Sequence, residues 1–542
     1  MNRKTFSGLA DLPPPARRQF LQRLGIALAA PGIPAALRFA VNELCEGTAY
    51  AAGAESKLPT YFIEFNYRDQ VDWGQVAIAP GLVSAYGSLA RGDTGRKAAL
   101  FFDQSQIIKG PNNFYLTPDS QALLPHLDTI AFIDSGELTA GAIHGHNAAN
   151  RNRAPDCSTT AKPGQSPMWT RDPTTQFPTG VEPYQSAIPT PASLHNYYQK
   201  SLTPGTRNGV VFKGVTRAKH TIYHFGANLP GSELDRMQEK AQLFTAFPSA
   251  GAPAAAGVLP NSAEAELLAR ILKRIDPAWL QRRRYAKSAV DDHLAEMTEA
   301  QGLLTGVGSG LPIPGMTVPL TPDEEAYWKE GVPEQLQNGL TNYAGIAQDA
   351  DTLTHVRFQI WEQFALAYKL IAGGFTRTVA GDCEFIDHHD TRPQSNVRCQ
   401  TLQMAPSLAR LIEKLKAANL YDRTVIALYT CDGSRAPAAN SQGSDDMAKM
   451  TIILAGGGIK GGYYGDITVG GKVADGQSYE IHMPDPITGL PVPMGSTKGS
   501  VGRIPGSVMW RTVAKAMGIP DTLISTFPLV ADAKPMDFLL RT

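Results

Sequence analysis

The strongest constraint on the fold is an apolar run that follows a helical pattern in the second half of the chain. Residues 424–430 read TVIALYT, a run rich in β-branched and aromatic side chains. Such a run is typical of a strand that is buried on both faces of a sheet. Apolar residues recur at helical spacing from Leu408 to Leu415, which predicts a helix over 406–418 that stops at Asn419. Together they favour an α/β fold with a doubly wound, mainly parallel sheet.

Acidic residues and histidines stand just after two of the predicted strands. Asp432 follows the run that ends at Thr430, and Asp387 follows the short apolar pair Phe385 and Ile386. Ligands of open α/β sheets bind at the carboxyl ends of the strands, so both acids are expected at one edge. Carboxylates together with imidazoles are ligands of divalent cations. The candidate metal ligands of this stretch are Asp387, His388, His389, Asp432, Asp445 and Asp446.

The first third of the chain adds further candidates for the same edge. Strands are predicted at 60–65 (TYFIEF) and at 128–134 (DTIAFID), and the second of these ends in an acid. Ser135 follows it directly and is the positional candidate for a nucleophile. His144 and His146, one residue apart in IHGHN, are candidate metal ligands. A Pro- and Thr-rich stretch over 154–191 has no periodicity, and we interpret it as a loop that covers the site.

Length and composition describe an ordinary globular chain. It has 542 residues, of which 43% are hydrophobic, and the 50 Lys and Arg balance the 50 Asp and Glu. This balance gives no support to a nucleic-acid-binding surface. Helical patterns dominate the middle of the chain. We therefore predict two parts of an α/β core, at 52–231 and 343–542, separated by a helical insertion or cap at 232–342.

The N-terminus carries a pattern for export. Arg17 and Arg18 stand before Gln19-Phe20-Leu21 and an apolar stretch, which resembles a twin-arginine signal, although Ala16 replaces the usual Ser or Thr. A cleavage site near Ala49 and Ala51 makes residues 1–51 the predicted signal. The expected partner is the twin-arginine export machinery, and the expected location is periplasmic or secreted. No later apolar run approaches the roughly 20 residues that span a bilayer.

Two features leave alternatives open. After loss of Cys45, four cysteines remain, and Cys383 with Cys399 could close a disulfide around Asp387 or stay as buried thiols. The glycines of 456–462 (GGGIKGG) are expected to supply positive φ angles in a turn. The alternative is that their backbone amides bind a phosphate group.

Several motifs occur in an order that resembles a known family. LTPDSQALLPHLDTIAFIDSG, IHGHNAANR, the Asp-His-His group, a strand followed by an acid and Arg435-Ala436-Pro437, and LAGGGIKGGYYGD follow one another. The chain is similar in this to a family of exported bacterial proteins of unknown function that is grouped with the alkaline phosphatase and sulfatase superfamily. The resemblance covers most of the mature chain and implies an alkaline-phosphatase-like core.

The resemblance also implies roles for individual residues. Asp387 and His389 match an Asp-x-His pair of metal ligands, and Arg435 matches a family arginine that could hold an anion. Asp432 stands where the family has Glu, and Asp446 stands after Asp445 where it has His. His146, with His144 as the alternative, would match the histidine after the second strand. The Ser-His group that the family carries after its first strand is missing here.

Two functions follow from these expectations. The first is an exported metal-dependent hydrolase of phosphate or sulfate esters, with a small-molecule or glycan ester as substrate. Its cofactor would be a divalent metal, with zinc first and magnesium, calcium or manganese as alternatives. The second is a relative that has lost turnover and serves as a binding or assembly protein of the cell envelope. The missing Ser-His group and Asp446 in place of His motivate this alternative.

Overall fold

The computed structural model describes a large part of the chain in separate ranges. These are residues 60–69, 74, 76–85, 102–134, 189–202, 207–212, 229, 232, 234–237, 239–247, 316–338, 358–386, 394–430, 435–440, 443–446, 451–473, 476–493, 504, 506–531 and 533–541. The predicted signal at 1–51 lies outside them. Within these ranges, no helix combines the length and apolarity that crossing a membrane would require.

Strands of the described ranges form one large sheet and three small ones. The eight strands of the large sheet follow the order β12-β4-β11-β8-β1-β7-β5-β6. Their bounds are β1 Tyr61–Asp69, β4 Ile130–Asp134, β5 Val210–Phe212, β6 Asp235–Met237, β7 Thr378–Ile386, β8 Thr424–Thr430, β11 Thr451–Gly456 and β12 Gly462–Tyr464. The small sheets pair β2 Ile108–Lys109 with β3 Tyr115–Leu116, β9 Arg435–Asn440 with β10 Gly443–Asp446, and β13 Asp466–Val473 with β14 Gly476–Pro484 and β15 Pro491–Pro493.

The large sheet is parallel except for one strand. β1 pairs in parallel with both β7 and β8, and β5, β6 and β12 continue the same direction through their own neighbours. Only β11, among the described strands of this sheet, runs the other way, between β8 and β4. The predicted α/β class and the mainly parallel sheet are therefore confirmed.

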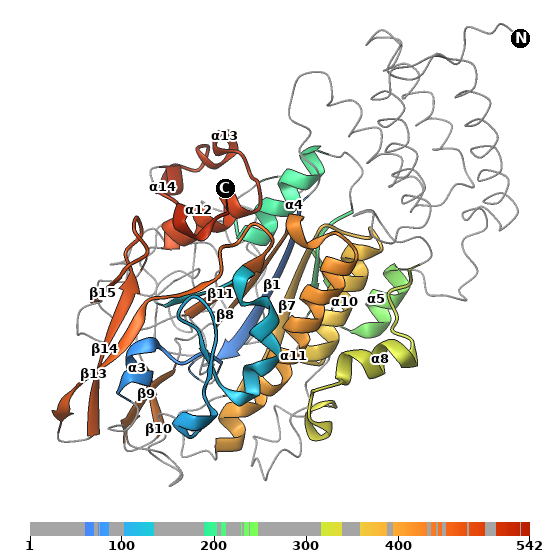
Figure 1. Cartoon of the computed structure of the whole chain (residues 1–542). Coiled ribbons are helices and arrows are strands. Elements are labelled where there is room, and N and C mark those ends of the chain that lie inside the picture. Colours follow the sequence, from blue (N-terminus) through green and yellow to red (C-terminus); the bar gives the residue numbers. More distant parts are fainter. Residues whose placement is uncertain are drawn as a thin grey trace, which may run out of the picture.

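Helices cover both faces of the sheet (Figure 1). One face packs against α10 and α11, with α5, α8 and the 3-10 segment η7 beside them, and the other packs against α4 and α12. The described helices are α3 Pro80–Ser84, α4 Pro191–Leu202, α5 Lys240–Ala246, α8 Pro322–Lys329, α10 Ile360–Ala372, α11 Gln394–Ala417, α12 Gly506–Ala516, α13 Asp521–Ile524 and α14 Pro528–Ala531; the 3-10 segments are η6 Gln104–Gln106, η7 Pro118–Thr129, η9 Glu334–Leu336, η10 Tyr421–Arg423 and η11 Asp537–Leu539.

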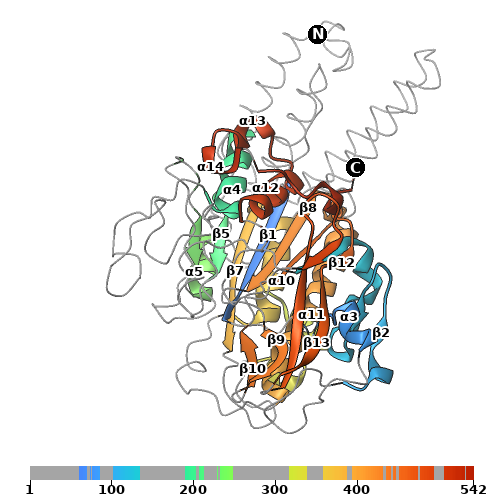
Figure 2. The same ribbon diagram turned by 90° about the vertical axis from the view of Figure 1, so that its left-hand side faces the viewer.

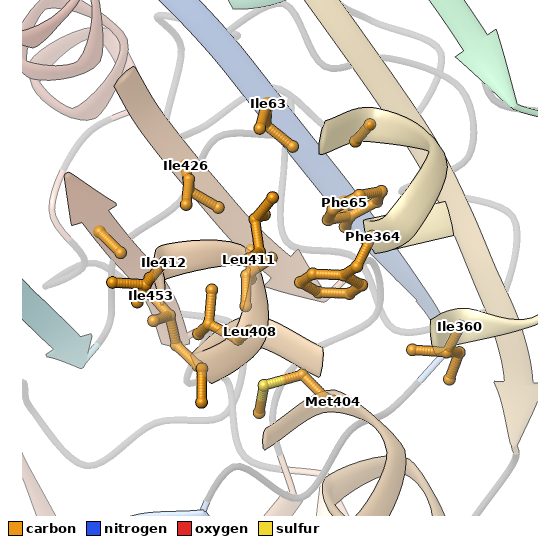
Figure 3. Packing of buried hydrophobic residues seen from close by; sticks show 14 of the residues in the cluster. Ile63, Phe65, Ile360, Phe364, Met404, Leu408, Leu411, Ile412, Ile426 and Ile453 are labelled. Carbon is orange, nitrogen blue, oxygen red and sulfur yellow. The ribbon is translucent and has the colours of Figure 1, made fainter. Parts of the chain in front are cut away.

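Alternation along β1 explains the two-sided burial. Ile63 and Phe65 point into the core beneath α10 and α11, whereas Phe62 belongs to the cluster under α4 and α12. Figure 3 shows the first of these cores, where the rings of Phe65 and Phe364 lie against each other with their centroids 4.3 Å apart. As predicted, β8 is buried on both faces, because Ile426 joins one cluster and Val425 the other.

The structure describes only part of the predicted helical insertion or cap. Residues 232–342 contribute α5 and α8 to one face and β6 to the edge of the large sheet, but much of this range lies outside the described residues. The domain boundaries therefore stay predictions.

The predicted disulfide is not formed in the structure. Cys383 in β7 and Cys399 in α11 are both buried, and both are thiols.

Candidate functional site

The carboxyl ends of four parallel strands meet at one edge of the large sheet. Tyr67 of β1 is in register with Thr430, the last residue of β8, and with Cys383 of β7. Across β11, Asp134 at the end of β4 is in register with Thr451. Asp387, Asp432 and Ser135 follow the ends of β7, β8 and β4 by one, two and one residues, respectively.

A hairpin beyond this edge pairs two of the candidate residues. In the antiparallel pair β9 and β10, Arg435 stands in register with Asp446, and Asp445 precedes Asp446 in β10. Both strands lie beyond the carboxyl ends of the large sheet in the two views, and α12 and α13 lie at the opposite end (Figures 1 and 2). The backbone thus brings an arginine and an acid pair together on the segment that follows β8.

The candidate residues fall into two groups, those outside the described ranges and those described by their backbone alone. Asp387, His388, His389, Asp432, Ser135, His144 and His146 lie outside the described residues, and the description of Arg435, Asp445 and Asp446 stops at the backbone. Among the side chains that are described, no three His, Cys, Asp or Glu residues lie close enough together to hold a metal ion. The predicted metal ligands therefore stay predictions. What the structure adds is the position of the strands that precede them.

Asp134 is a described acid at this edge, and its side chain is fully buried. The hydroxyl of Tyr463 donates to its Oδ2 at 2.8 Å, and the hydroxyl of Thr451 donates to its Oδ1 at 3.2 Å. Burial raises the pKa of Tyr463 well above its ordinary value, and the charge of Asp134 raises it further. Tyr463 therefore stays a hydrogen-bond donor. The sequence indicates Asp134 only as the acid that ends a strand.

A second buried acid lies deeper in the sheet. Glu64 of β1 is fully buried and accepts a hydrogen bond of 2.9 Å from the hydroxyl of Tyr429 in the neighbouring β8. The acid inside the apolar run TYFIEF was the available signal, but no role was predicted for it. Each of the two acids therefore has a tyrosine of an element beside it as a partner.

Asp466 extends the polar surroundings of Asp134 toward the small β13 sheet. Its Oδ1 accepts hydrogen bonds from the backbone N–H groups of Gly81 at 2.7 Å and of Ile467 at 2.8 Å. Burial raises the pKa of Asp466, and the charge of Asp134 adds to this, while these hydrogen bonds act in the other direction. Gly465 precedes it with a φ of +111°, and a Cβ there would come within 2.5 Å of the Cβ of Asp134. Only glycine fits at this approach.

Several backbone amides of the glycine turn at 456–462 donate within the fold, which argues against the phosphate-binding alternative. The N–H groups of Gly457, Lys460 and Gly461 donate to the carbonyl oxygens of Tyr421, Leu539 and Asp128. The turn also follows β11, whose direction places its end away from the edge where β4 and β8 end. The expected positive φ is found only at Gly456 among the five glycines of this turn, with a value of +154°. At Gly457 and Gly461 glycine is needed for another reason, because a Cβ would overlap Asp422 or the backbone of Leu127.

Comparisons with known proteins give little. No family model matches the sequence, and no curated protein matches it. Among solved structures, the crystal structure of Ps i-CgsB in complex with k-i-k-neocarrahexaose is similar at 11% sequence identity and a TM-score of 0.27, over 89% of this chain and 76% of that chain. A similarity at this level shows neither a shared family nor a shared function.

Proposed function

We propose that this chain is an exported, metal-dependent hydrolase of the phosphatase and sulfatase type that acts on phosphate or sulfate esters. The observation that supports it is the strand arrangement β8-β1-β7, in which two parallel strands that precede Asp432 and Asp387 flank β1. Neighbouring strands lie about 4.8 Å apart, so the starting points of the two acidic segments are about 10 Å apart. Side chains from both segments can reach a common ion over that distance.

The residue types fit a divalent cation. Asp387, His388 or His389, Asp432, Asp445, Asp446 and His144 or His146 would supply the carboxylate and imidazole ligands that such ions prefer. When bound, the metal would polarise the ester and offset negative charge on its oxygens.

The chain's own groups would perform the remaining tasks of the reaction. The planar guanidinium of Arg435 would bind two oxygens of the phosphate or sulfate group and orient it. Ser135 is the candidate nucleophile, because it leaves β4 at the edge where β7 and β8 end. An alkaline-phosphatase-like core belongs to the same proposal and is supported by the order of the sequence motifs.

Metal analysis of the purified, unchelated protein tests this proposal. We expect one or two equivalents of zinc, manganese, calcium or magnesium by mass spectrometry, and Asp387→Ala should lose this metal because a carboxylate ligand is removed. Asp323→Ala is the control, since Asp323 is an exposed acid in the first turn of α8. Hydrolysis of aryl phosphate and aryl sulfate esters should fall with the metal content.

The alternative function predicts a different combination of results. A relative without turnover that binds or assembles other components of the cell envelope would retain metal and fail to hydrolyse any ester. The missing Ser-His group after β1 motivates this candidate. Equal metal content in the wild type and Asp387→Ala would contradict the metal assignment in both cases.

Export is a separate part of the proposal. The paired residues Arg17 and Arg18 support it, and replacing both by lysine should block export while the protein still accumulates inside the cell. Cell fractionation followed by immunoblotting measures this. Unchanged export of the double variant would remove the twin-arginine assignment without affecting the metal proposal.

A further inference from the structure

The side chain of Asp134 connects two points at which segments with candidate site residues join the large sheet. It is the last residue of β4, and Ser135, His144 and His146 follow in the chain. Its partner Thr451 is the first residue of β11, and Asp445 and Asp446 precede that strand. One carboxylate thus joins the start of one candidate segment to the end of the other.

The hydrogen bonds hold this junction from two sides. Oδ1 accepts from Thr451 and Oδ2 accepts from Tyr463, so rotation of the carboxylate about its last bond would break both contacts. The ring of Tyr463 is itself fixed, because it stacks on Phe132 with an interplanar angle of 12° and meets Phe114 edge to face. Asp134, Thr451 and Tyr463 are all buried, so these hydrogen bonds are shielded from water and hold the carboxylate in place.

We propose that Asp134, with Thr451 and Tyr463, is a positioning group of the candidate metal site. It touches neither substrate nor metal, and it fixes where the segments that carry Ser135, His144, His146, Asp445 and Asp446 leave the sheet. Residues that orient metal ligands contribute roughly 10–100-fold to metal affinity in other proteins. The inference rests on the proposed metal-dependent function.

Tyr463→Phe is the test, because it removes the hydroxyl and keeps the stacked ring. The chain offers a matched control at the other end of β4, where the buried hydroxyl of Tyr421 lies 2.8 Å from that of Thr129. Both variants lose one buried tyrosine hydroxyl next to the same strand. Both should therefore show similar, modest decreases in melting temperature.

Metal affinity separates the two variants. We expect Tyr463→Phe to raise the metal dissociation constant about tenfold or more, measured by competition with a chelator below the melting temperature, and Tyr421→Phe to change it less than twofold. Thr451→Val should act like Tyr463→Phe, because it releases the other carboxylate oxygen. Equal affinity of the wild type and Tyr463→Phe, or an equal loss in Tyr421→Phe, would overturn the inference.

Hydrogen exchange decides the inference if the wild type binds no metal and the proposed function fails. Peptides that contain Asp134 with the residues after it, and Thr451 with the residues before it, should exchange faster in Tyr463→Phe and not in Tyr421→Phe. The same exchange in all three proteins would refute a positioning role for Asp134. If the wild type binds no metal and Tyr463→Phe still exchanges faster, the positioning role of Asp134 stands. Only its connection to a metal site is then refuted.

Discussion

Replacing Phe65 by alanine is expected to lower the free energy of unfolding by about 3–5 kcal/mol. Phe65 lies at the centre of β1, is fully buried, and stacks on Phe364 of α10 (Figure 3). Gly381 of the neighbouring β7 also leaves no room for a side chain, since a Cβ there would overlap Phe65. These neighbours fit closely against the ring, so a cavity would remain after truncation.

Urea denaturation at neutral pH measures the loss. Ile487→Ala is a control, because Ile487 is 74% exposed and its truncation should change the free energy of unfolding by less than about 0.5 kcal/mol. Phe65→Leu should lie between the two, because leucine fills part of the cavity. A decrease below 1 kcal/mol for Phe65→Ala would show that β1 is not the centre of the core.

The second large effect is a loss of stability in acid that depends on His195. Burial lowers the pKa of His195 in α4 to about 3, and the charge of Arg377 contributes to this. Its Nδ1 lies 2.7 Å from the hydroxyl of Thr378, and its Nε2 lies 3.1 Å from that of Thr60. Gln199, which donates to the hydroxyl of Thr60, also accepts from Arg377. The folded protein therefore keeps this imidazole neutral.

The sign of the effect follows from comparing the two states. Unfolded histidine has a pKa of about 6.5, so below that pH the unfolded chain takes up a proton that the folded chain refuses. This contribution to stability is present above pH 6.5 and is lost as the pH falls toward 3, with a full size on the order of 5 kcal/mol.

Thermal unfolding at several pH values between 7 and 3.5 checks this. His195→Gln should be less stable than the wild type at pH 7, because the threonine contacts are disturbed, but its stability should fall less between pH 6.5 and 3.5. Ile487→Ala is the control, since Ile487 is exposed and carries no titratable group, and its curve should run parallel to that of the wild type. Parallel curves for the wild type and His195→Gln would refute the prediction.

Local patterns predicted much of the scaffold. The run TVIALYT is β8 over the predicted residues, and α11 ends where Asn419 takes a left-handed φ of +55°. α11 begins at Gln394, twelve residues before the predicted start at Pro406. The helix continues through it, and the earlier turns are held by the pair of hydrogen bonds from Arg398 to Asp119. Tertiary contacts decided that boundary.

For the candidate site, the sequence predicted only that acidic residues follow the ends of strands. That Asp387 and Asp432 follow strands that end at one edge of the sheet could be inferred from the sequence and the topology rules of α/β sheets, whereas the position of β1 between those strands could not. The pairing of Asp134 with Tyr463 could not, because 329 residues separate the partners and the motifs that contain them carry no sign that they meet. The reversed direction of β11 was also missed, since a fully apolar strand reads the same in both directions.

The reversal of β11 makes the whole excursion between β8 and β11 a long hairpin. The two strands are direct neighbours, so the chain leaves and re-enters the sheet at adjacent positions and needs no crossover. Lengthening such a closed excursion adds little to its closure entropy, about 0.6 kcal/mol for each doubling of its length. Insertions between residues 431 and 450 should therefore cost the scaffold little stability, as long as β8 and β11 keep their pairing.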